Sequence, residues 1–146
     1  EVIGAQWNEF DLTNKIWTIP ASRMKKRREH VVPLNGLACM IINNMPKHNS
    51  SEFIFLNNSK KSHIDNNKMN VTLKTYLPEF HKKTVPHGFR SSFRNWAEEN
   101  YNFSRRAVEL CLSHTNKNKV ENAYLRSNLF GKRQQIMSEW NKFLQK

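Results

Sequence analysis

The chain has 146 residues, the length of one ordinary domain, and carries 24 Lys and Arg against 12 Asp and Glu, for a formal net charge of +12. This excess favours a polyanionic partner, above all nucleic acid, over a basic protein that binds nothing specific. The sequence shows no signal peptide, and it excludes a membrane-spanning helix because no stretch approaches about 18 apolar residues.

Residues 1–34 carry the pattern of β-strands. In "KIWTIP", residues 15–20, apolar and polar side chains alternate as in a half-buried strand, and "HVVPL", residues 30–34, is a second β-rich run. The polar and basic segment "ASRMKKRRE" connects the two runs. We therefore expect a β-hairpin with a long connection.

Helices are expected over most of the remaining chain. Asn35 can cap a helix through "GLACMIINN", "PKHNSSE" reads as a loop, and "FIFL" reads as a short strand or an extended packing segment. Residues 57–68 read as a polar loop, after which "NVTLKTYLPEF" has helical spacing that Pro78 ends or bends. Further helices are expected at residues 88–98, 104–112, 117–125 and 129–144.

The expected fold class is therefore α+β, mostly α, with a small antiparallel hairpin or sheet near the N-terminus. No internal repeat and no linker divides the chain, so a single domain is expected. Cys39 and Cys111 each lie in an apolar run, which favours buried free thiols over a disulfide.

His87 and Arg90 form the first candidate site. They stand three residues apart, on one face of a helix whose first backbone N–H groups have no partner within the helix. Such a helix start can seat a phosphate, although an exposed histidine beside an exposed arginine has the same pattern. Phe89, Phe93 and Trp96 lie on the other face and are expected in the core.

His114 and Tyr124 form the second candidate site. His114 follows an apolar helix and opens a polar turn, and Tyr124 comes ten positions later on a separate expected helix. Each also has a structural explanation. Histidine is favoured at a helix C-terminus, and Tyr124 shares with Val120 and Ala123 the spacing of a buried helix face.

The hairpin connection is the third candidate. Six of the nine residues in "SRMKKRREH" are Lys, Arg or His, which fits either a solvated run of charge or a tip held against a nucleic-acid backbone. A two-metal nuclease needs several convergent carboxylates, and Asp11 and Asp65 are the only aspartates. We therefore expect no metal and no other cofactor, and any phosphoryl chemistry would depend on cationic donors.

Four segments in order resemble the catalytic domain of the tyrosine recombinases, in the branch of prophage, satellite-phage and genomic-island integrases. Residues 2–34 resemble the hairpin region of the family, and "PHGFRSSFRNWAEE" resembles its His-x-x-Arg helix. "LSHTNKNKVENAYLRS" resembles its His-then-Tyr segment, and "KRQQIMSEWNKFL" resembles the terminal helix of this branch. The resemblance covers almost the whole chain.

The resemblance implies a role for each of five residues. Tyr124 matches the nucleophile, which forms a 3′-phosphotyrosyl link to DNA and releases a 5′-hydroxyl. Arg90 and His114 would hold the scissile phosphate, and His87 would assist proton movement at the tyrosine. Lys25 would protonate the departing oxygen, with Lys26 as the alternative after a one-residue slip. Contacts to DNA are expected from Lys26, Arg27, Arg28, Ser91, Arg94, Lys117, Lys119 and Arg126.

The implied function is site-specific DNA recombination that integrates or excises a mobile element. The resemblance also implies double-stranded attachment sites as substrate, a homotetramer of the full-length protein, no membrane, and a location at the nucleoid in the bacterial cytoplasm. The family carries a further catalytic arginine in an Arg-x-x-Glu pattern whose glutamate matches Glu1. Residues 1–146 are thus expected to be a catalytic-domain fragment truncated on its N-terminal side and weakly active or inactive alone.

Three questions stay open at the level of sequence. The terminal helix at 129–144 can pack in cis or dock on a neighbouring protomer. The chain can instead be a metal-independent ribonuclease, with His87 and His114 as acid and base, Lys25 stabilising charge and Tyr124 in the core. It can also be a catalytically silent DNA-binding module. A covalent protein–DNA adduct that Tyr124→Phe abolishes would distinguish the recombinase from both.

Overall fold

The computed structural model describes residues 1–100, 102–114 and 128–146. Its sheet region contains the 3-10 helices η1 (Trp7–Glu9) and η2 (Ala21–Arg23) and the strands β1 (Phe10–Asp11), β2 (Ile16–Ile19) and β3 (His30–Pro33). The helices are α1 (Gly36–Asn43), α2 (Lys68–Tyr76), α3 (Pro78–His81), α4 (Gly88–Asn100), α5 (Arg105–Cys111) and α7 (Phe130–Leu144). The expected mixture of helices with a small antiparallel sheet near the N-terminus is confirmed.

The sheet has three antiparallel strands in the order β1-β2-β3. The expected hairpin is β2 with β3, in which Ile16 lies opposite Pro33 and Ile19 lies opposite His30. Trp17 and Ile19 are buried in β2, as the alternating pattern predicts. The prediction missed β1, because two residues are too few to show a strand period.

The sheet shares one core with α1 and with the segment that contains "FIFL". This core consists of Ala5, Trp17, Ile19, Met24, Ile42 and Ile54. Ile54 is almost fully buried, and its backbone N–H donates to the carbonyl of Ala5 at 2.9 Å. The segment is therefore an extended packing segment with isolated bridges, which was one of its two expected forms.

A second core joins α4, α5 and α7. Its buried members are Phe93, Trp96, Ala97, Ala107, Val108, Leu112 and Ile136. Trp140 of α7 packs edge-on against Phe93 of α4 and lies 4.8 Å from Trp96 between ring centroids. The apolar stripe of α7 packs into this core at Ile136 and Trp140, whereas Phe143 and Leu144 stay about half exposed.

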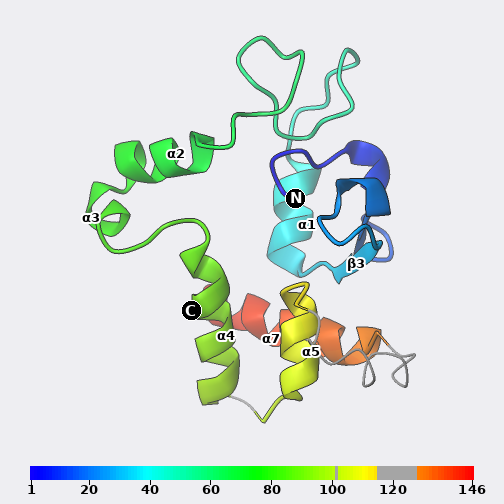
Figure 1. Cartoon of the computed structure of the whole chain (residues 1–146), viewed down its shortest axis with the longest axis vertical. Coiled ribbons are helices and arrows are strands. Elements are labelled where there is room, and N and C mark those ends of the chain that lie inside the picture. Colours follow the sequence, from blue (N-terminus) through cyan, green and yellow to red (C-terminus); the bar gives the residue numbers. More distant parts are fainter. Residues whose placement is uncertain (101, 115–127) are drawn as a thin grey trace.

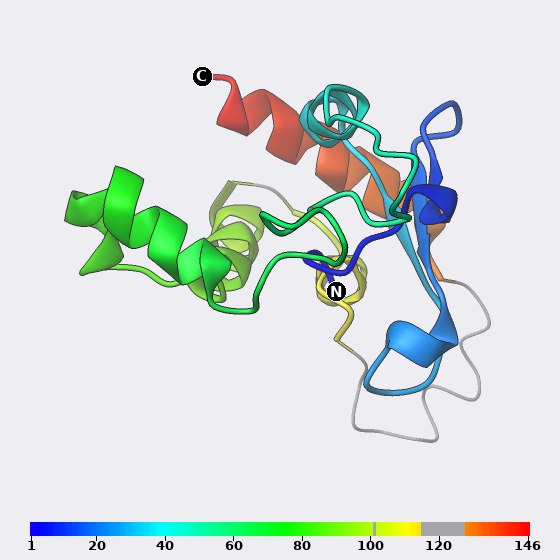
Figure 2. The ribbon, with the colours of Figure 1, turned by 90° about the horizontal axis from the view of Figure 1, so that it is seen from above.

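Helix α7 packs against both cores within the same chain. The backbone N–H of Leu37, at the start of α1, donates to the side chain of Asn141 at 2.8 Å. Nearer its start, α7 contacts β3 through Arg133. Figure 2 shows α7 running from the sheet past α1 toward the C-terminus. The helix therefore packs in cis along the face that these residues occupy.

Helices α2 and α3 project away from the two cores, as Figures 1 and 2 show. The expected break at Pro78 is confirmed, since α2 ends at Tyr76 and α3 begins at the proline. Only Leu73 is buried on α2, while Tyr76 is 76% exposed. Phe89, expected in the core, is 52% exposed at the start of α4, because the chain there lies beside this projecting arm and outside the helical core.

Both cysteines are free, as expected, and both are half-buried. Burial raises the pKa of the Cys111 thiol, which lies against α7. None of the helices in the described ranges combines the length and the hydrophobicity that a membrane crossing requires.

Candidate functional site

Arg90 of α4 lies against the turn that carries His114. Its Nη2 donates a hydrogen bond to the carbonyl of Leu112, the C-cap residue of α5, and His114 follows two positions later. Arg90 lies on α4, whereas His114 lies in the turn after α5, and the two are well separated in sequence. The packing of α4 against α5 through Phe93, Ala97 and Val108 therefore brings a guanidinium and an imidazole of the two candidate sites into one neighbourhood.

The turn at His114 has a defined geometry. Ser113 adopts a left-handed conformation with φ of 56°, and the backbone N–H of His114 donates to the carbonyl of Glu109 at 2.9 Å. The Nδ1 atom of His114 lies 2.6 Å from a carboxylate oxygen of Glu109. Because an ionised carboxylate only accepts, Nδ1 carries the proton, which leaves Nε2 for a ligand. The His114 side chain is 49% exposed, so a ligand can reach it.

Glu109 also binds Arg94, which we expected to contact DNA. Nε of Arg94 lies 3.3 Å from one oxygen of Glu109 and 3.2 Å from an oxygen of Glu98 on its own helix. In this structure Arg94 thus links α4 to α5. Glu109 was missed by the sequence reasoning, although an acid five positions before His114, close to the turn expected to hold it, was a usable signal.

His87 and Ser91 lie at the exposed start of α4. The backbone N–H of Arg90 donates to the carbonyl of His87 at 3.2 Å, which keeps the two residues one turn apart as expected. His87 directly precedes α4 and Arg90 lies in its first turn, so both are at the solvent-facing start of the helix, with Phe93 and Trp96 buried further along it.

The basic connection between β2 and β3 is exposed from Lys25 to Arg28. Arg27 adopts a left-handed φ of 49°, and its backbone N–H donates to the carbonyl of the buried Met24 at 2.9 Å. In the described part of the chain, no direct contact joins Lys25 to Arg90 or His114. Lys25 is therefore accessible and lies next to the buried Met24. Its approach to a phosphate stays a prediction.

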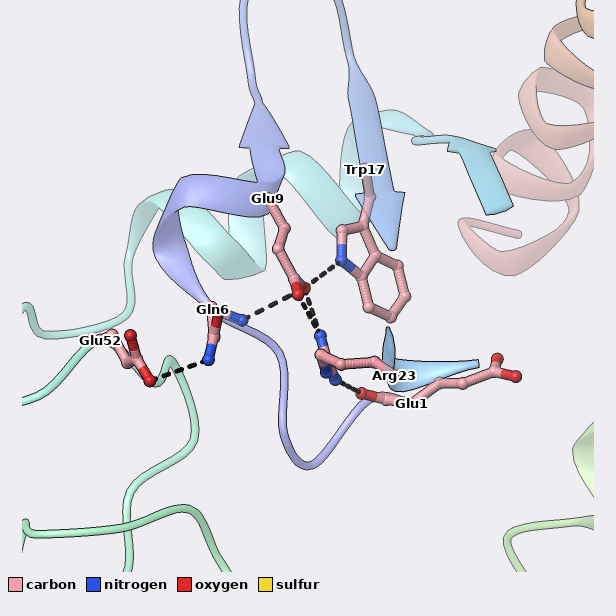
Figure 3. A network of polar contacts seen from close by, with 6 residues as sticks. All are labelled: Glu1, Gln6, Glu9, Trp17, Arg23 and Glu52. Atoms are coloured by element: carbon pink, nitrogen blue, oxygen red, sulfur yellow. Dashed lines mark hydrogen bonds and ion pairs between the residues drawn. The ribbon is translucent and has the colours of Figure 1, made fainter. Parts of the chain in front are cut away.

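A buried polar network anchors the start of this connection (Figure 3). Glu9 is 7% exposed, forms an ion pair with Arg23 of η2, and accepts from the indole N–H of Trp17 at 2.9 Å. Arg23 also donates to the backbone carbonyl of Glu1. Lys25 stands two residues beyond Arg23, so the network determines where the exposed part of the connection begins.

Two further basic side chains belong to the same neighbourhood. The sequence reasoning included His30 only as the last residue of the basic segment at the hairpin connection, and it missed Arg133. His30 of β3 has a lowered pKa because of burial and the positive charges of Arg133 and Arg90, while Glu1 acts in the opposite direction. Arg133 of α7 is 2% exposed. A signal for Arg133 was present, since it stands three positions before Ile136 on the apolar stripe of the terminal helix.

Tyr124, Lys117, Lys119 and Arg126 lie outside the described residues, as do the expected helix at 117–125 and Tyr101. The geometry of the site is therefore described for the basic groups alone. These groups come from β3, α4, the end of α5 and α7.

Taken together, these features define a basic α+β domain in which a small sheet and a helical core bring arginine and histidine side chains to one place. Such a cluster is suited to holding an oxyanion. Residues 1–129 match the model of the phage integrase family. The chain belongs to that family, within the prophage and phage branch of the tyrosine recombinases.

Three relatives illustrate the similarity. The chain is 35% identical over 142 residues to prophage integrase IntA of Escherichia coli K12, covering 96% of this chain and 34% of that protein. It is 31% identical over 147 residues to the integrase of Shigella phage Sf6, covering 99% and 37%. It is 28% identical over 150 residues to the integrase of Enterobacteria phage P4, covering 93% and 34%. The chain thus spans about a third of the length of these relatives. No solved structure matches it.

Proposed function

We propose that the protein containing this chain is a site-specific DNA recombinase that integrates and excises a mobile element. The observation that carries the proposal is the contact of Arg90 with the carbonyl of Leu112, which sets a guanidinium beside the turn of His114. Membership of the phage integrase family supports the same reaction class. The net charge of +12 supports DNA as substrate.

In the proposed reaction, the phenol oxygen of Tyr124 attacks the scissile phosphorus and the bond from phosphorus to the 5′-oxygen breaks. Lys25 gives a proton to the departing 5′-oxygen, and His87 accepts or steers the proton of the phenol. Arg90 and His114 donate to the non-bridging oxygens, where negative charge grows in the transition state. The phosphotyrosyl bond conserves the energy of the broken link, so a second 5′-hydroxyl can reverse the step.

Further parts of the proposal concern the whole protein. Residues 1–146 serve as part of a catalytic domain that the rest of the polypeptide completes, and four protomers act together on two DNA duplexes. The chain spans about a third of the length of its relatives. If the rest of the polypeptide supplies a donor to the developing oxyanion, the isolated chain cleaves more slowly, typically by about 10²–10³ for one donor. Strand cleavage by the isolated chain at the rate of the intact protein would contradict this part.

The test is a trapping assay with the intact protein and a nicked suicide substrate, from which a short strand diffuses away so that religation fails. We expect a covalent protein–DNA adduct in the wild type and none in Tyr124→Phe. Cleavage of RNA of the matching sequence that forms no adduct and requires His87 and His114 would instead favour a ribonuclease. Salt-dependent binding with neither adduct nor cleavage would favour a silent binding module.

A further inference from the structure

Arg133 is a buried cation that the proposed reaction does not use. The residue is 2% exposed, and burial lowers the pKa of its guanidinium. Holding a charge away from water is costly unless the charge is paired. The partners of Arg133 are nonetheless neutral. Its Nη2 donates to the carbonyl of Val31 at 2.6 Å, and the Cys111 thiol lies close enough to the guanidinium to influence its pKa. No carboxylate lies within ion-pair distance of it in the described ranges.

The position of Arg133 connects two segments of the candidate site. Val31 lies on β3, the strand that directly follows the basic connection with Lys25. Cys111 is the last residue of α5, three residues before His114. From α7, the guanidinium therefore bonds to the strand behind Lys25 and lies beside the end of the helix before His114. Its charge also reaches His30, as does that of Arg90, so these groups share one neighbourhood.

We propose that Arg133 is a positioning residue for strand cleavage: its guanidinium fixes β3 to α5 and thereby sets Lys25 over the phosphate held by Arg90 and His114. This inference rests on the proposed function. The planar fork of arginine carries donors in several directions and can bind two elements at once, whereas the single ammonium of lysine is a point donor on a flexible stem. Charge alone is therefore not enough, and Arg133→Lys loses part of the function.

The test separates the position of Lys25 from every other step. With ordinary DNA, the 5′-oxygen needs a proton as its bond to phosphorus breaks. With a sulfur atom in place of that oxygen, the phosphorus–sulfur bond breaks and the thiolate leaves without a proton, because a thiol has a pKa of only about 8.5. The intact protein and its Arg133→Lys and Arg133→Met variants are compared on both substrates by the rate of adduct formation at saturating DNA.

We expect both variants to slow adduct formation on ordinary DNA by about 10- to 100-fold, the size of effect that a misplacement of about 1 Å produces. On the sulfur substrate we expect most of that slowing to disappear. The ratio of the two rates is the readout, so a smaller folded fraction in Arg133→Met cancels. Lys132→Met removes one exposed charge from the neighbouring position of α7 and should leave the ratio unchanged.

Equal slowing on both substrates would show that Arg133 only supports the fold, and unchanged rates would show that it has no role; either result overturns the inference. Failure of the proposed function looks different, because the wild type would then form no adduct with either substrate. Arg90→Lys is a further comparison, since weaker binding of the phosphate slows both substrates alike.

Discussion

At the scale of single residues, the carboxylate of Glu9 is a buried charge in the sheet region that depends on several hydrogen-bond donors. Its oxygens accept from Arg23, from the indole of Trp17 and from the backbone N–H of Gln6. The Glu9 side chain is 4% exposed and that of Arg23 is 19% exposed, so solvent screens the pair only weakly. The network, seen in Figure 3, keeps a buried charge satisfied.

We predict that Glu9→Gln lowers the free energy of unfolding by about 3 kcal/mol, because removing one partner of a buried ion pair leaves the other charge uncompensated. Glu52→Gln is the matched control. Glu52 accepts a side-chain hydrogen bond from Gln6 at the surface, so its change should cost less than about 0.5 kcal/mol. Urea unfolding measures both values, and similar losses of stability in the two variants would contradict the importance of the Glu9 network.

His30 provides a prediction about pH. Its pKa is lowered in the folded protein by burial first and then by the charge of Arg133. The unfolded chain therefore takes up a proton from about pH 6.5 downward, whereas the folded chain takes it up only at lower pH. Stability should fall as pH decreases through this window and should be unaffected by His30 above it. In His30→Gln, the free energy of unfolding should depend less steeply on pH over the same window. An identical slope in the wild type and the variant would contradict a lowered pKa of His30.

At the scale of elements, α1 shows how a cap signal in the sequence becomes structure. The side-chain oxygen of Asn35 accepts from the backbone N–H of Ala38 at 2.8 Å, and Asn35 is 8% exposed. We predict that Asn35→Ala lowers the free energy of unfolding by about 1–2 kcal/mol, whereas Asn35→Asp, which also caps, is much less destabilised. Asn43→Ala at the other end of α1 serves as control in the same unfolding experiment and should have little effect.

Elements with a strong local signal were predictable from the sequence. The alternation around Trp17 and Ile19 indicated β2, Asn35 indicated the start of α1, and Pro78 indicated the break between α2 and α3. The exposure of Tyr76 and Phe89 was not predictable, because helical spacing shows that a face is apolar without showing what lies against it.

The candidate site divides in the same way. The spacing of His87 and Arg90 and the turn at His114 were readable as local patterns, and the structure brings Arg90 to that turn. The contacts of Glu109 with Arg94 and of Arg133 with Val31 join residues from different elements. Such contacts depend on tertiary packing. Residue type and spacing therefore indicated the position of a charged residue in the sequence, but did not indicate its partner in the fold.

At the scale of the whole molecule, α7 joins the two cores. It contributes Ile136 and Trp140 to the helical core, Arg133 to the contact with β3 and Asn141 to the contact with α1. The sheet that carries the basic connection, the helix that carries Arg90 and the helix that precedes His114 are therefore placed relative to one another by a single helix. A terminal helix that packs in cis in this way is part of the architecture that the proposed active site requires.

The charge of the molecule leads to the last prediction. Each DNA phosphate that a basic side chain neutralises contributes about 0.9 to the slope of log K against log salt. Arg27→Gln with Arg28→Gln, on the exposed basic connection, should therefore make the slope shallower by about 0.9 for each phosphate that the variant no longer neutralises.

Lys60→Gln with Lys61→Gln removes the same total charge from the loop before α2 and should change the slope much less, since that loop carries no candidate residue. Binding of the intact protein to duplex DNA across a series of salt concentrations measures both slopes. Equal changes in the two double variants would mean that DNA responds to net charge alone and that the connection makes no phosphate contact of its own.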